Sequence, residues 1–281
     1  MKLTFMIFVY FIASHLCFAV QKVHLSIDDV NAVLRDLTEN EKKYDSLFDQ
    51  KFFKYLKNLN EKYGAKITLY CFYELNDFCL ADCTEKFKKE FSASSEWLKF
   101  GYHAYNGTTV FYNDGGGGYK MFVESVLKFA GSGQCVSQTV RLDRFSGRRE
   151  ECAACSYRNM EYGIRQLLTA DSRTRQSYYL SDAEIAELND RELYVDGNTG
   201  IEFYSTDFRF DDCKNFKRLC KENMGESEVV VFTHEWLLNV PVRKNLFRYI
   251  QFLCKRFFVK RNISVFLHSF EIKECEYVTD F

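Results

Sequence analysis

Four side chains with catalytic or metal-binding chemistry stand at the ends of strand-like segments: Asp28, Asp29, His103 and His234. A carboxylate and one or two imidazoles can bind a divalent cation such as Zn²⁺ and leave one position open for water. A neighbouring carboxylate can take a proton from that water, and a histidine can protonate the leaving group. The chain has only five histidines, so two of them at strand ends favour a site. These residue types predict metal-assisted hydrolysis.

Two further polar residues lie beside strand-like segments. Arg141 stands in the segment 139–145, and Asp171 follows the segment 167–169. An arginine beside a carboxylate favours its ionised form and fixes its position. Each residue type also has an ordinary structural use. Aspartates cap the starts of helices, histidines occur in protein cores with their hydrogen bonds made there, and arginines form surface ion pairs. The hypothesis therefore depends on the whole set of residues.

Strand-like and helix-like segments alternate along most of the chain. The segment 66–73 is rich in β-branched and aromatic residues, whereas 46–63 repeats apolar residues at helical spacing and ends at Gly64. The pattern also predicts a helix at about 243–258 and a last strand at 262–270. Alternation of this kind predicts βα units and a largely parallel sheet.

Seven or so such units around one core predict an α/β fold, namely a closed or nearly closed (β/α) barrel. An open doubly wound sheet is the alternative. In both folds the chemistry belongs at the carboxyl ends of the strands, where the candidate residues stand.

Five short motifs resemble those of the polysaccharide deacetylase (NodB-like) superfamily and occur in the same order. They are residues 24–29, which resemble the T-F-D-D motif, then 100–103, the region of Arg141, 168–171 and 232–234. The resemblance spans about residues 22–270 and implies a (β/α) barrel that is seven-stranded and distorted. It implies that Arg141 holds the catalytic base and that Asp171 orients the catalytic histidine, His234.

The resemblance also assigns the metal site. It implies that Asp28 is the general base and that Asp29 binds the metal ion, Zn²⁺ or another divalent cation, together with His103. The family's second motif has another histidine four residues after the first, where this chain has Gly107. His234 or another carboxylate is then the candidate for the missing ligand.

The first 19 residues form a unit of their own. Lys2 precedes an apolar run, and Cys17 and Ala19 place small residues at a cleavage position, which is typical of a secretory signal peptide. We therefore expect a single deacetylase-like domain over residues 20–281 in a secreted or cell-surface protein. An uncleaved N-terminal anchor is the alternative, and membrane association is expected only through this segment.

The composition of the chain limits the kinds of partner and cross-link that we expect. A formal net charge of −1 gives no reason to expect nucleic-acid binding. Ten cysteines follow residue 19, and an even number in an exported chain suggests disulfides. For the close pair Cys152 and Cys155, a local disulfide and free thiols are both open, and a zinc ribbon is disfavoured because the next pair has looser spacing.

The sequence therefore predicts a carbohydrate-active hydrolase that deacetylates an N- or O-acetylated polysaccharide or other glycan. Two alternatives remain open. One is a non-catalytic glycan-binding protein on the same scaffold. The other is a metal-independent glycosidase that uses paired carboxylates such as Asp28 and Asp171.

Overall fold

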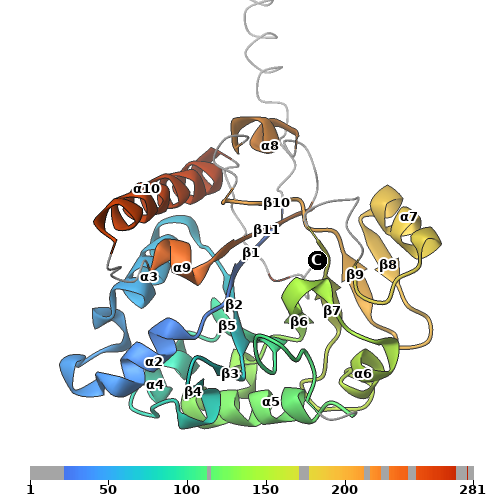
Figure 1. The fold of residues 1–281 in the computed structure, drawn as a ribbon, viewed down its shortest axis with the longest axis horizontal. Coiled ribbons are helices and arrows are strands. Elements are labelled where there is room, and N and C mark those ends of the chain that lie inside the picture. Colours follow the sequence, from blue (N-terminus) through green and yellow to red (C-terminus); the bar gives the residue numbers. More distant parts are fainter. Residues whose placement is uncertain are drawn as a thin grey trace, which may run out of the picture.

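A parallel sheet forms the centre of the computed structural model, which describes residues 22–112, 115–170, 177–211, 216–222, 228–239, 245–269 and 277. Its strand order is β10-β11-β1-β2-β5, and every neighbouring pair is parallel (Figure 1). The strands are β1 (Lys22–Asp28), β2 (Ile67–Phe72), β5 (Leu98–Ala104), β10 (Phe208–Arg209) and β11 (Glu228–His234). The prediction of an α/β protein with a parallel sheet is confirmed.

A second sheet of four short strands continues from this one, in the order β6-β7-β9-β8. Parallel bridging between Phe100 of β5 and Val136, just before β6, joins the two sheets. Only the β8–β9 pair is antiparallel in this sheet. The strands are β6 (Thr139–Val140), β7 (Gln166–Leu168), β8 (Leu193–Val195) and β9 (Glu202–Tyr204), and a separate hairpin consists of β3 (Glu74–Leu75) and β4 (Phe78–Cys79).

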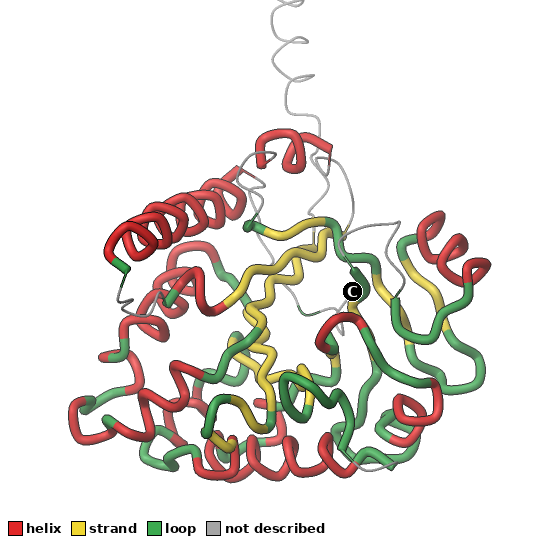
Figure 2. Tube along the Cα trace, in the orientation of Figure 1, coloured by secondary structure: helices red, strands yellow, loops and turns green. Residues whose placement is uncertain are grey.

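Helices lie around the strands (Figure 2). The α-helices are α2 (Ala32–Glu39), α3 (Lys51–Tyr63), α4 (Lys88–Ala93), α5 (Gly117–Ala130), α6 (Arg149–Ala154), α7 (Asp182–Arg191), α8 (Phe216–Glu222), α9 (Glu235–Leu238) and α10 (Leu246–Ser269). Helix α3 illustrates why they form. Its buried side chains recur at helical spacing, and Gln50 caps its start by accepting a hydrogen bond from the Phe52 N–H. Gly64 ends it in the left-handed conformation.

Two predictions from the sequence are wrong. The segment predicted as a last strand, 262–270, lies in α10 as far as Ser269, because Val259, Ile263 and Phe266 continue a helical spacing of buried residues. The cysteines that the structure describes are free thiols, so the expected disulfides are not formed among them. For Cys152 and Cys155, free thiols are one of the two outcomes that the sequence left open.

Close packing at one glycine shapes the centre of the sheet. The ring of Tyr70 on β2 lies over Gly101 of β5, where an added Cβ would come within 2.4 Å of a ring carbon. The hydroxyl of the same tyrosine donates to the carbonyl of Thr139 on β6. Tyr70 therefore holds β2, β5 and β6 together directly below the carboxyl ends of the strands.

Candidate functional site

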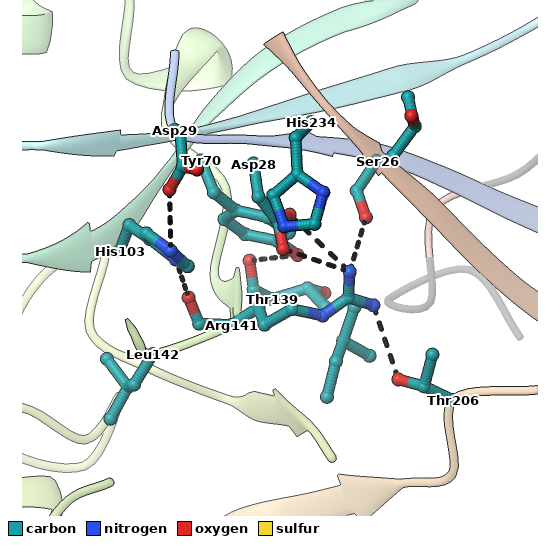
Figure 3. A network of polar contacts seen from close by, with 12 residues as sticks. Ser26, Asp28, Asp29, Tyr70, His103, Thr139, Arg141, Leu142, Thr206 and His234 are labelled. Carbon is teal, nitrogen blue, oxygen red and sulfur yellow. Dashed lines mark hydrogen bonds and ion pairs between the residues drawn. The ribbon is translucent and has the colours of Figure 1, made fainter. Parts of the chain in front are cut away.

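The carboxyl ends of β1, β5 and β11 bring the predicted residues together (Figure 3). In the register of β1 and β11, Asp28 lies level with His234. His103 comes from β5, two strands away from β1, and Arg141 follows β6 directly. Asp28, Asp29, His103, Arg141 and His234 thus form one cluster. The predicted Asp171 lies outside the described residues.

A buried ion pair occupies the centre of this cluster. The Arg141 side chain is 1% exposed, and its Nη1 lies 3.4 Å from Oδ1 of Asp28. The guanidinium also donates to Ser26 Oγ at 3.2 Å and to Thr206 Oγ1 at 3.3 Å. Its Cζ lies 4.0 Å from the ring centroid of Phe232. Burial raises the pKa of Asp28, and the charge of Arg141 opposes that rise.

The backbone conformation at Asp29 lets the side chains of both Asp28 and Asp29 face the site. Successive residues of a strand point to opposite faces. Asp29 has a φ of +64°, a left-handed conformation that is uncommon for residues other than glycine. The chain therefore leaves the strand at this residue, and the Asp29 side chain reaches His103 (Figure 3). Strained backbone of this kind clusters at functional sites.

Two residues fix the turn that follows Asp29. The side chain of Asn31 pairs with both backbone groups of Phe72, donating to its carbonyl and accepting from its N–H at 2.9 Å. The buried carboxylate of Glu235 accepts from the N–H groups of Asn31 and Ala32 at 3.2 and 3.0 Å. Burial raises the pKa of Glu235 to about 7. The sequence analysis did not assign a role to either side chain.

The contacts of His103 define which atom faces Asp29. His103 Nδ1 lies 2.6 Å from the carbonyl oxygen of Arg141. A carbonyl oxygen only accepts, so Nδ1 carries the hydrogen. In the neutral imidazole, Nε2 then presents a lone pair toward Asp29 Oδ1, 3.4 Å away. Two acceptors in this position require a cation between them, which is either a proton or a metal ion.

Both a shared proton and a bound metal ion between Asp29 and His103 agree with the structure. Burial alone would lower the pKa of His103, but the hydrogen bond with Asp29 and the charge of Asp28 raise it above its ordinary value. Burial would raise the pKa of Asp29, but the hydrogen bond with His103 lowers it. A separation of 3.4 Å also matches two neighbouring ligands of a tetrahedral Zn²⁺ ion, which are about 3.3–3.4 Å apart for bonds of about 2.0–2.1 Å. The Nδ1–H bond to a carbonyl is the usual support of a metal-binding histidine.

His234 forms a second histidine–carboxylate pair. Its Nδ1 lies 2.7 Å from Oδ2 of Asp211, and the other oxygen of Asp211 accepts from the Thr233 hydroxyl at 2.9 Å. Burial lowers the pKa of His234, but the Asp211 hydrogen bond and the charges of Asp28 and Asp211 raise it above the ordinary value. Asp211 thus orients a histidine whose protonated form is favoured, which suits a proton donor.

The sequence analysis missed Asp211. It stands two residues after β10, which has only two residues and gives no recognisable strand pattern. Asp211 could have been found by searching for polar residues at strand ends, as for the other site residues, because β10 is parallel to β11 and ends on the same edge of the sheet.

A pocket of about 380 Å³ opens beside Asp29. Its lining contains the acids Asp29, Asp143 and Glu235, the cations Arg35 and Arg144, the rings of Phe72, Phe78 and Trp236, and Asn31, Ala32, Leu75, Asn76 and Gly107. Gly107 stands where the family resemblance expects a histidine. A Cβ built there meets only Leu75, at 3.8 Å. Within the described residues, no group of three or more His, Cys, Asp or Glu side chains is placed to hold a metal ion.

Neither protein-family models nor curated proteins gave a match to this chain. The class of protein is therefore argued from the geometry of the site and from the motifs in the sequence.

Replacing the orienting carboxylate tests the His234 pair. We expect Asp211→Asn to lower the pKa of His234 by roughly 1–2 units, because the amide keeps the shape but removes the negative charge that favours imidazolium. The measurement is a pH titration of the imidazole signals by NMR. Asp143→Asn, in the pocket lining, is the matched control and should leave the pKa of His234 in place. An unchanged pKa in Asp211→Asn would contradict the pairing.

Proposed function

We propose that this protein is a metal-dependent hydrolase that removes acetyl groups from an acetylated glycan, on a distorted (β/α) barrel of the polysaccharide deacetylase type. One observation carries the proposal. The buried carboxylate of Asp28, which pairs with Arg141, stands next to Asp29 of the Asp29–His103 pair and level with His234 of the Asp211–His234 pair, on one edge of the sheet. A base, a cation site and a proton donor are the parts that amide or ester hydrolysis needs.

The barrel is supported by contacts at both ends of the central sheet. Phe100 and Val136 connect β5 to the second sheet. On the other side, the N–H of Asp207 donates to the carbonyl of Val230 on β11, only three residues after β9 ends at Tyr204. Apart from β8, which pairs with the outer edge of β9, the strands of the two sheets follow one another in chain order, and this order supports a (β/α) barrel.

Asp29 and His103 are the residues that would hold the metal ion. A bound Zn²⁺ ion would polarise the scissile carbonyl and lower the pKa of water at the site. The donor set fits such an ion through the two facing acceptors, Asp29 Oδ1 and His103 Nε2. His234 is the less suitable third ligand, because its Nδ1 is bound to Asp211 and its geometry favours proton transfer.

The chain's own residues would carry the protons. Asp28 accepts a proton from water as the water oxygen bonds to the acyl carbon. Its raised pKa strengthens it as a base relative to an ordinary aspartate. The bond from the acyl carbon to nitrogen or oxygen then breaks, and the imidazolium of His234 gives a proton to the leaving group. Trp236, in the pocket lining, offers an aromatic face to a sugar ring.

The two alternatives from the sequence differ in what supports them. Gly107 in place of a metal-binding histidine supports a non-catalytic glycan-binding protein. The glycosidase depends on the separation of Asp28 and Asp171, and Asp171 lies outside the described residues. Secretion or surface display is proposed from residues 1–19, which also lie outside them.

Acetate release from acetylated chito-oligosaccharides tests the proposed reaction. We expect Asp28→Asn to lower kcat about 10²–10⁴-fold, because the general base is removed. Chelation should abolish activity in the wild-type protein, and added Zn²⁺ should restore it. Asp77→Asn, at an exposed position, is the control and should keep wild-type activity. Activity that survives both chelation and Asp28→Asn would exclude this function.

The Gly107 position offers a gain-of-binding test. Gly107→His places an imidazole in the pocket that contains Asp29, at a position where a side chain has room. We expect this variant to bind Zn²⁺ more tightly than the wild type by roughly 10–100-fold, since a third protein ligand completes the usual site. Competition with a chromophoric chelator measures the change, and Gly107→Ala is the matched control. Equal affinities of the His and Ala variants would place the metal site elsewhere.

A further inference from the structure

Helix α10 exposes an unusual amount of apolar surface. Eight large hydrophobic side chains are exposed in the part of the chain that the structure describes, and six of them belong to this one helix. They are Leu246, Phe247, Ile250, Phe257, Phe258 and Val265. Phe247 and Leu246 are 71% and 69% exposed. Contiguous exposed apolar surface of this kind marks an interaction site.

The exposed residues lie on the face of α10 that points away from the protein. Val259, Ile263 and Phe266 are buried, and the helix packs against α9 and α3 (Figure 1). At 100° per residue, Ile250 and Phe257 lie on the side opposite to these three. One face of the helix therefore packs against the core, and a second apolar face is exposed.

The charge of α10 identifies the chemistry of the partner. Its 24 residues include five cations and no aspartate or glutamate, although the whole chain has a net charge of −1. The cations are Arg248, Lys255, Arg256, Lys260 and Arg261. Lys255 and Lys260 lie over the rings of Trp236 and Tyr55, where the helix meets the rest of the protein, whereas Arg248 and Arg261 are exposed. A partner of opposite charge with an apolar interior complements this surface.

These features favour a lipid surface over a second copy of the chain. Two such helices packed through their outer faces would bring the exposed Arg261 of each copy close to the other, without an acidic residue on either helix to offset the charge. Within the described residues, no helix is long and apolar enough to cross a membrane. A helix that exposes Phe, Leu and Ile together with arginines has the composition of a helix that lies in the plane of the membrane interface.

We propose that α10 binds flat on an anionic bilayer surface. Leu246, Ile250 and Phe257 enter the boundary between headgroups and acyl chains, and the exposed cations Arg248 and Arg261 contact the anionic headgroups. Trp236, which lines the pocket, packs edge-on against Phe252 on the inner side of α10. The candidate active site is thereby attached to the helix that contacts the membrane.

A tryptophan placed on the outer face reports this contact directly. The full-length variant Phe257→Trp is mixed with phosphatidylcholine vesicles that contain or lack phosphatidylserine, and wild-type emission from Trp97 and Trp236 is subtracted. We expect a blue shift and quenching by brominated acyl chains only with the anionic vesicles. Val195→Trp, exposed outside α10, is the matched control and should show neither effect.

Substitutions separate the apolar and ionic contributions to vesicle binding. Ile250→Ser with Phe258→Ser should lower the bound fraction at least tenfold, whereas Val195→Ser should not. Arg248→Gln with Arg261→Gln should lower affinity roughly fivefold for each cation removed, and added salt should reduce that difference. These effects are expected in the full-length chain.

Three outcomes would overturn the proposal. An unquenched Trp at 257 on vesicle-bound protein would place the contact in residues 1–19. Equal quenching on vesicles without phosphatidylserine would remove the ionic contribution. A concentration-dependent dimer that cross-links through the exposed Cys254 and is lost in Ile250→Ser with Phe258→Ser would show a second copy as the partner.

Discussion

The buried ion pair of Arg141 and Asp28 is the interaction on which the rest of the site depends. Two charges in a nearly water-free position are tolerated only when they are paired and hydrogen-bonded. Arg141 meets this condition with groups from three other segments, namely Ser26 on β1, Thr206 after β9 and the ring of Phe232 on β11. One side chain therefore fixes the distances between strand ends that are far apart in the sequence.

Arg141 also controls the second half of the site through its backbone. Its carbonyl accepts from His103 Nδ1, so the side chain of Arg141 pairs with Asp28 while its backbone turns Nε2 of His103 toward Asp29. The result is a division of roles between two histidines. His103 faces Asp29 through Nε2, where the proposed metal ion would bind, whereas His234 is held by Asp211, as the proposed proton donor requires.

Strand-end reasoning predicted much of this arrangement. Asp28, Asp29, His103 and His234 were found because each stands at the carboxyl end of a strand of several residues, and parallel strands end on one edge. Asp211 and Thr206 were not found, because they flank a strand of two residues. The left-handed turn at Asp29 and its support by Asn31 and Glu235 depend on long-range contacts that no local pattern encodes. The strand predicted at 262–270 was wrong because β-branched and aromatic residues also suit a packed helix when they recur at helical spacing.

A double-mutant cycle at Asp28 and Arg141, followed by urea unfolding, tests the central claim most directly. Arg141→Met alone should cost about 3–5 kcal/mol of unfolding free energy, because it leaves a buried carboxylate without a partner. Adding Asp28→Asn should recover much of that loss, since no lone charge remains, and the two changes should couple by about 2 kcal/mol or more. Additive effects of the two substitutions would show that the pair does not organise the site.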